Sequence, residues 1–109
     1  VDMFDCVLPT RLARNSAALT RTGRLNMQNA VFTRDPGPIE EGCTCYACRT
    51  FTRAYVRHLM RAGEILGAVL LTIHNVHLLL TMMREMREAI FEDRLAAYAE
   101  SFLAAWART

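Results

Sequence analysis

Three of the four cysteines in this chain lie within six residues, as Cys43, Cys45 and Cys48. Disulfides between such close neighbours would be strained, and the sequence shows no secretory signal that would favour oxidation. Thiolates at this spacing are instead typical of tetrahedral zinc sites, which need four ligands. The cluster therefore predicts a zinc ion and requires a fourth donor from elsewhere in the chain.

Spacing alone leaves the fourth ligand open. Cys6 lies in an apolar segment, where a buried free cysteine is ordinary, so a histidine is favoured. The candidates are His58, His74 and His77. His74 is modestly preferred because an unpaired imidazole would be costly in its strongly apolar stretch, although a backbone carbonyl would also satisfy the ring. A site closed by four protein ligands leaves no position for substrate, so we expect the metal to be structural.

The first half of the chain predicts a strand, a hairpin and then the cysteine loop. Residues 1–8 are mostly apolar, as in a buried strand, and Pro9 would end that strand. Short strands over 16–20 and 24–28 flank a turn and predict a hairpin. Proline and glycine at 35–38 predict a loop that leads into the cysteines.

The second half predicts helices. An apolar stripe over 51–60 recurs every fourth residue and favours a helix from about residue 50, which Gly63 ends or interrupts. A second helical stretch covers 64–90, with a break expected near Gly67, and a third covers 94–107. The apolar part of the second stretch contains five polar residues, so we expect a buried helix rather than a membrane span.

The basic residues of this chain are all arginines, thirteen in number. Residues 1–61 carry a formal charge of +4 and residues 62–109 carry −2. Four arginines recur every fourth residue: Arg49, Arg53, Arg57 and Arg61. One continuous helix would present them as a row, which either binds nucleic-acid phosphates or is offset by acidic neighbours.

Two carboxylates interrupt the apolar first segment. With the two-residue period of a strand, Asp2 and Asp5 would point to opposite faces, so they are not a natural acid–base pair. Asp5 is a nucleophile, a general base or, by default, an ion-pair partner for Arg11 or Arg14. The residues alone do not choose among these roles.

Several motifs together closely resemble the bacterial tRNA-guanine transglycosylases (queuine tRNA-ribosyltransferases). They are Asp-Met-Phe-Asp-Cys-Val-Leu-Pro-Thr-Arg from Asp2, Ala-Arg-Asn from Ala13, the cysteine array, Arg-Ala-Tyr from Arg53, Gly-Glu-Ile-Leu-Gly-Ala from Gly63 and Thr-Ile-His-Asn from Thr72. The resemblance runs almost from Val1 to Trp106. It departs at Ser16, where many relatives have glycine, and this puts only the local turn in doubt.

The resemblance implies an α/β fold, namely the C-terminal fragment of a (β/α)₈ TIM-type barrel with an inserted zinc-binding subdomain (a β-hairpin plus helices) and C-terminal helices. It divides the chain into three parts. Residues 1–15 would form a late barrel strand with the active-site and wobble-recognition loop, 16–75 the zinc-binding subdomain, and 76–109 the helices that close the barrel. Reacting groups lie at the C-terminal ends of strands in such barrels, which fits Asp5.

The resemblance also implies the activity. Asp5 matches the nucleophile that attacks the ribose at wobble guanosine 34 of tRNA, so that guanine is exchanged for the 7-deazaguanine preQ1 in queuosine biosynthesis. A carboxylate suits this role because the transition state at an anomeric carbon resembles an oxocarbenium ion. The residues matched to recognition of the anticodon loop are Thr10, Arg11, Leu12, Ala13 and Arg14. Those matched to the structural Zn²⁺ are Cys43, Cys45, Cys48 and His74.

The implied protein is a cytoplasmic pentosyltransferase whose partners are tRNA and preQ1 or guanine, with no membrane or DNA partner. The full-length protein would form a homodimer, and this fragment alone would be inactive. The purine pocket and a second catalytic aspartate would lie upstream of this chain, so base specificity cannot be read from it. The alternative is a non-catalytic, zinc-stabilised RNA-binding module or accessory subunit.

Overall fold

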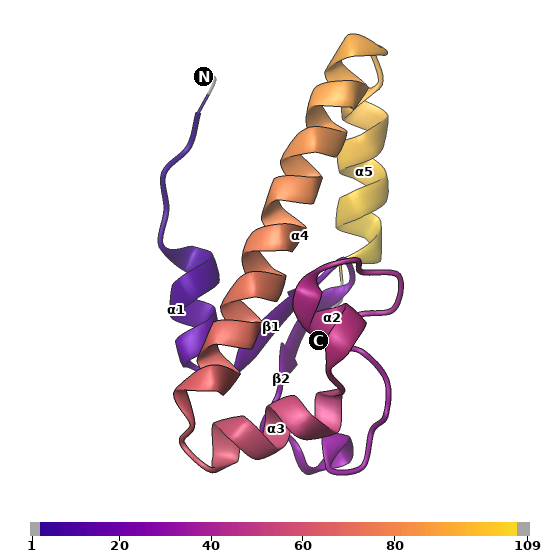
Figure 1. Cartoon of the computed structure of the whole chain (residues 1–109). Coiled ribbons are helices and arrows are strands. Elements are labelled where there is room, and N and C mark those ends of the chain that lie inside the picture. The colour runs from indigo at the N-terminus through magenta and orange to yellow at the C-terminus, as the bar shows by residue number, and fades with distance from the viewer. Residues whose placement is uncertain (1–2, 107–109) are drawn as a thin grey trace.

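One long helix organises the fold. The computed structural model describes residues 3–106 of the chain. Helix α4 (Ile65–Phe91) has 27 residues and extends along the molecule, with α1 (Leu8–Arg14) beside its N-terminal half and α5 (Leu95–Ala105) beside its C-terminal half (Figure 1). Helix α3 (Arg53–Arg61) crosses near the start of α4. The predicted helix over 64–90 is confirmed.

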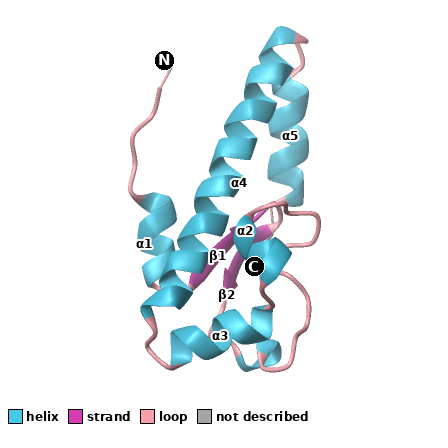
Figure 2. Cartoon of the chain, viewed as in Figure 1, coloured by secondary structure: helices cyan, strands magenta, loops and turns pink. Residues whose placement is uncertain are grey.

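The sheet in the described part of the chain is a two-stranded antiparallel hairpin (Figure 2). Strand β1 (Ala17–Thr20) pairs with β2 (Gly23–Asn26), and Thr20 lies opposite Gly23. The predicted hairpin is confirmed, with strands slightly shorter than expected. The outer edge of β1 lies against α4 rather than against another strand.

Two short helical segments were not predicted. The 3₁₀ turn η1 (Ala30–Phe32) follows the hairpin, and α2 (Tyr46–Thr50) begins inside the cysteine cluster. Between α2 and α3 the chain is extended at residues 51–52, and the Thr52 side chain accepts a hydrogen bond from the Tyr55 N–H to cap α3. The expected helix from about residue 50 is therefore α3, which starts three residues later, at Arg53.

Two glycines explain how α3 meets α4. Gly63 has a φ of +74°, and the next amide, of Glu64, donates to the Leu59 carbonyl over 2.9 Å, which closes the C-terminus of α3. Gly67 does not break α4, contrary to expectation. It is buried where α3 crosses, and a Cβ there would lie 2.7 Å from the sulfur of Met60. The helices approach so closely that only glycine fits without movement.

The predicted strand over residues 1–8 is wrong. Residues 3–7 have no regular secondary structure and are exposed, while residues 1–2 lie outside the described range. Helix α1 starts at Leu8, with Pro9 in its first turn, where a missing N–H costs nothing. A strand needs a neighbouring backbone to pair with, and residues 3–7 pair with no strand of the described chain.

The core lies between the hairpin, α2, α3 and the N-terminal half of α4. Its fully buried large side chains include Met27, Ile39, Val56, Leu70 and Leu71. By length and composition, helix α4 could cross a membrane, but helices buried in a protein core can be equally long and apolar. Its N-terminal half is packed against the rest of this core, as the sequence predicted.

Helix α5 packs more loosely, and none of its residues is fully buried. Its rings Tyr98 and Phe102 stack along one side together with Trp106, the residue after the helix. Residue 107, the last of the predicted helix, lies outside the described range.

Candidate metal centre

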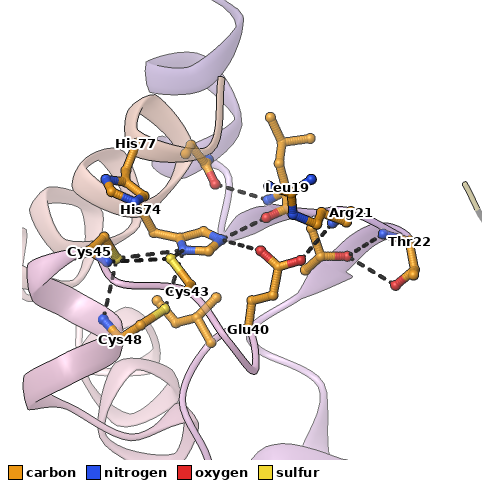
Figure 3. Close-up of polar contacts among 12 residues, drawn as sticks. Leu19, Arg21, Thr22, Glu40, Cys43, Cys45, Cys48, His74 and His77 are labelled. Carbon is orange, nitrogen blue, oxygen red and sulfur yellow. Dashed lines mark hydrogen bonds and ion pairs between the residues drawn. The ribbon is translucent and has the colours of Figure 1, made fainter. Parts of the chain in front are cut away.

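The cysteine loop and the middle of α4 meet at one cluster of four donor atoms. The Sγ atoms of Cys43, Cys45 and Cys48 and a ring nitrogen of His74 all lie within 4.8 Å of one another (Figure 3). The His74 Nδ1 is 3.5, 3.7 and 3.4 Å from the three sulfurs in that order. Bond lengths of about 2.3 Å to sulfur and 2.05 Å to nitrogen in a tetrahedral zinc site place sulfur and nitrogen about 3.5 Å apart. The residues therefore fit a structural zinc ion.

Backbone amides shape the cysteine loop around its own sulfurs. Cys45 caps α2, since its Sγ accepts a hydrogen bond from the Cys48 N–H at 3.3 Å. The Cys43 Sγ accepts from the Cys45 N–H at 3.5 Å. Such donors stabilise negative charge on sulfur, which is the form that binds a metal.

The other nitrogen of His74 fixes the tautomer. His74 Nε2 lies 2.7 Å from the carbonyl oxygen of Leu19 in β1. A carbonyl can only accept, so Nε2 carries the hydrogen and the Nδ1 lone pair faces the sulfurs. Metal-bound histidines commonly use their second nitrogen in this way. Glu40 also approaches Nε2, at 4.0 Å.

The three thiols are too crowded to ionise independently. A hydrogen bond from Cys48 lowers the pKa of Cys45 to about 3, and the same contact, together with burial, raises the pKa of Cys48. Burial raises the pKa of Cys43 as well. Three thiolates in this volume require a cation between them, which is a further reason to regard the cluster as a metal site.

The other candidates for the fourth ligand lie elsewhere. Cys6 is exposed on the segment before α1, and His58 is exposed on α3. His77 lies one turn after His74 on α4, where its Nε2 is 3.2 Å from the hydroxyl of Thr44. His74 is fully buried among the three sulfurs.

Asp5 and the predicted RNA contacts lie on α1 and the segment before it, outside the cysteine cluster. Asp5 is exposed. Within α1, Arg11 and Arg14 are exposed and three residues apart, so they share one side of the helix, whereas Leu12 and Ala13 are buried. The Thr10 hydroxyl donates to the Val7 carbonyl at 3.1 Å. The helix thus divides the predicted recognition residues into a packed side and a free side.

The expected row of four arginines is reduced to three, since Arg53, Arg57 and Arg61 recur every fourth residue along α3. Arg49 belongs to α2 instead and donates to the Thr44 carbonyl. Arg53 pairs with Asp35 at 3.2 Å and also donates to the Ile39 carbonyl, so it holds the loop rather than facing a ligand.

Arg57 is likewise committed, to the carbonyls of Gln28 and Asn29. Arg49 falls outside the row because the extended residues 51–52 interrupt the helical period between α2 and α3.

Comparison with known proteins identifies the family. The family model described as queuine tRNA-ribosyltransferase matches residues 1–108. The chain belongs to the queuine tRNA-ribosyltransferase family. It is similar to the queuine tRNA-ribosyltransferase of Desulforudis audaxviator, with 63% identity over 105 residues, which is 96% of this chain. The relatives from Bacillus subtilis and Pelotomaculum thermopropionicum are 58% and 54% identical over 94% of this chain.

The chain spans only 27–28% of the length of these queuine tRNA-ribosyltransferases. The similarity therefore covers the metal cluster, α1 and the segment before it, while most of each relative has no counterpart here.

The sequence analysis missed two sets of polar interactions, one made by Asn75 and one centred on Glu85. Asn75, next to His74, is fully buried and hydrogen-bonds to β1 and α1. The sequence feature that could have identified Asn75 is its side-chain amide within a strongly apolar helix, where an unpaired polar group is costly. The second group links Arg21 of the hairpin turn to Glu85 of α4 and Tyr98 of α5. No local pattern marks that group, because its members are far apart in the sequence.

Proposed function

We propose that this chain is the part of a tRNA-guanine transglycosylase that supplies the nucleophile, contacts to the anticodon loop and a structural zinc site. Family membership supports the proposal, and one observation supports the roles assigned to particular residues. The exposed carboxylate of Asp5 lies just ahead of a helix whose free side bears Arg11 and Arg14. A carboxylate followed by a helix with two exposed arginines suits a nucleophile that must act on a polyanionic substrate.

The proposed reaction has two displacements at the same carbon. The Asp5 carboxylate attacks C1′ of the ribose at guanosine 34, the bond from C1′ to guanine breaks, and guanine leaves after gaining a proton. The ring nitrogen of an incoming 7-deazaguanine, preQ1, then attacks C1′, loses its proton and releases the carboxylate. The transition states resemble oxocarbenium ions, which a nearby anion stabilises.

The arginines would fix the anticodon loop. Arg11 and Arg14 are free to contact phosphates or bases, and Thr10 lies at the start of the same helix. Leu12 and Ala13 would contribute indirectly, by seating that helix on the core. Contacts to phosphates weaken as salt concentration rises, so binding that depends on these arginines should be salt-sensitive.

The finer architecture is also part of the proposal. In the full-length protein, the segment over 1–15 would complete a (β/α)₈ barrel, and 76–109 would help to close it. The large exposed side chains of Met3 and Phe4 support this, since they suit a segment covered by further protein. The complete protein would be a cytoplasmic homodimer that acts on tRNA and a free base.

Zinc would have a structural role. The three cysteines and His74 would hold it, and when bound it would supply four bonds that join the cysteine loop to α4. All four positions would be filled by protein, so the chemistry is assigned to Asp5.

The test is a covalent adduct in the full-length protein that carries this segment. Wild-type protein incubated with substrate tRNA should give a complex that survives denaturing electrophoresis, and Asp5→Asn should abolish it. Cys6→Ser, a change at the adjacent residue, should leave it intact. An adduct that persists in Asp5→Asn would overturn the assignment. Tight tRNA binding with no adduct in the wild type would favour an accessory RNA-binding subunit instead.

A further inference from the structure

Asn75 uses its whole side-chain amide to join three parts of the chain. Its Oδ1 accepts a hydrogen bond from the Leu19 N–H at 2.9 Å, and its Nδ2 donates to the carbonyls of Pro9 and Ala17, each at 3.1 Å. The side chain is fully buried. Rotating the amide by half a turn would place its NH₂ group against the Leu19 N–H and its oxygen against the two carbonyl oxygens. The surroundings therefore permit one orientation.

Asn75 and His74, both on α4, hydrogen-bond to the two backbone groups of a single residue of β1, Leu19. Asn75 accepts from the Leu19 N–H and His74 donates to the Leu19 carbonyl. The metal ligand and the amide are consecutive, so a displacement of either is transmitted to the same backbone. The position of α4 set by the metal therefore also sets the position of the Asn75 amide.

The third hydrogen bond of Asn75 goes to the start of α1. Pro9 lies in the first turn of that helix, four residues after Asp5 and shortly before the proposed RNA contacts. Helix α1 also packs along α4 through the buried Leu12 and Ala13. Apolar contacts would let α1 slide along α4. The hydrogen bond from Asn75 to the Pro9 carbonyl is directional and fixes the position of α1 along the axis of α4.

We propose that Asn75 is a positioning residue for the reaction, which sets the place of Asp5 and of the α1 arginines relative to the metal-held core. This inference rests on the proposed function. It assigns Asn75 no contact with substrate, since the side chain is buried. Its role is to hold the start of α1, because small displacements of reacting groups cost about 100-fold in rate.

The test compares Asn75→Asp with wild type in the full-length protein. The introduced carboxyl has the same shape and still accepts from the Leu19 N–H, but when ionised it opposes the carbonyls of Pro9 and Ala17. We expect one zinc per chain to be retained, kcat/KM for tRNA to fall about 100-fold, and the KM for the free base to stay unchanged. The KM for tRNA should rise, because the arginines of α1 would be displaced together with Asp5.

A merely structural role predicts different results. A smaller folded fraction would lower kcat alone, with the KM values for tRNA and for the free base as in wild type, and that outcome would overturn the proposal. Tyr98→Phe is the matched control, since it removes a hydrogen bond from the same helix system far from α1. It should leave kcat/KM for tRNA unchanged.

A second measurement does not depend on activity. In the full-length protein, amide hydrogen exchange in α1 should be at least tenfold faster in Asn75→Asp than in wild type, while exchange in α3 stays unchanged. Should Asn75→Asp fail to fold, Asn75→Ser, which leaves room for a bridging water, takes its place with the same expectations. Unchanged exchange in α1 overturns the positioning role. If the wild type exchanges no base in tRNA, but amide hydrogen exchange in α1 is faster in the variant, the proposed function is refuted and the structural role of Asn75 in holding α1 is not.

Discussion

His74 donates its Nε2 hydrogen to the carbonyl of Leu19 over 2.7 Å, while its Nδ1 faces the sulfurs of the cysteine loop. One imidazole thus connects the metal site to the hairpin as well as to its own helix. The loop, the hairpin and α4 consequently form one unit, whose cohesion depends on a metal that keeps the ring in this tautomer.

Removal of the metal should therefore loosen particular parts of the chain. A strong chelator is expected to lower the melting temperature and to increase amide hydrogen exchange in β1 and α2 more than in α5, whose contacts lie outside the cluster. Circular dichroism and hydrogen exchange measure both effects. Adding zinc back should restore the original values, and a melting temperature unaffected by chelation would show that the cluster needs no ion.

Replacement of a ligand should abolish tight zinc binding. In Cys45→Ser, the affinity for zinc should fall by more than the roughly 100-fold that loss of an outer hydrogen-bond partner costs. Cys6→Ser is the matched control because Cys6 is exposed and lies outside the cluster. Zinc content by elemental analysis should drop in the first variant and stay at one per chain in the second. Equal zinc content in both would contradict the ligand assignment.

The features predicted well from the sequence are those that local pattern determines. The cysteine spacing indicated a metal, and the burial cost of an imidazole favoured His74 over His58 and His77. The long helix and the hairpin followed from period and turn residues. In each case the physical cause acts within a few residues, or the candidates are few.

The features predicted poorly depend on distant partners. The apolar residues 3–7 resemble a strand, but they pair with no other strand within the described chain. The arginine period ignored the break at 51–52, and only the fold shows that Arg53 holds Asp35. Asn75 was visible as a polar residue in an apolar helix, yet its partners at Pro9 and Leu19 are far away in sequence.

The close approach of α3 and α4 at Gly67 gives a third prediction. In Gly67→Ala, the added methyl group would lie 2.7 Å from the Met60 sulfur and 3.1 Å from the Leu59 Cβ. The sulfur can move but the Leu59 Cβ cannot do so easily, so the free energy of unfolding should fall by about 1–3 kcal/mol. Denaturant unfolding measures the change.

A double-mutant cycle tests the cause. Adding Met60→Ala should make the cost of Gly67→Ala smaller by at least about 0.5 kcal/mol, since part of the clash is removed. Additive effects would show that Met60 does not take part in the clash.

Ser16 gives a fourth prediction. Its φ is +66°, in the left-handed region that favours glycine, which gives a physical reason for the glycine expected at this position in relatives. Its hydroxyl accepts a hydrogen bond from the Gln28 side chain at 2.8 Å, which offsets part of the strain. Ser16→Gly should raise the free energy of unfolding by about 0.5–1 kcal/mol.

Ser16→Ala is the informative comparison. It keeps the strain and loses the hydrogen bond with Gln28, so the free energy of unfolding should fall by about 0.5–1.5 kcal/mol. If glycine were no more stable than alanine at this position, backbone strain would not be the relevant term.

The pairing of Arg21 with Glu85 predicts how stability depends on pH. Two hydrogen bonds of 2.9 and 2.6 Å join the guanidinium to the carboxylate, and Arg21 holds the pKa of Glu85 below its usual value. A carboxyl with a depressed pKa in the folded state stabilises the fold above its unfolded pKa, and this contribution is lost as the pH falls through the folded value.

Glu85→Gln should therefore lower the free energy of unfolding at pH 7. The decrease should be only about 0.5–1 kcal/mol, because both groups are partly exposed. The difference from wild type should vanish in strong acid, whereas Glu88→Gln, at an exposed position on the same helix, should differ from wild type at neither pH. A difference for Glu85→Gln that is independent of pH would mean that the ion pair is not its source.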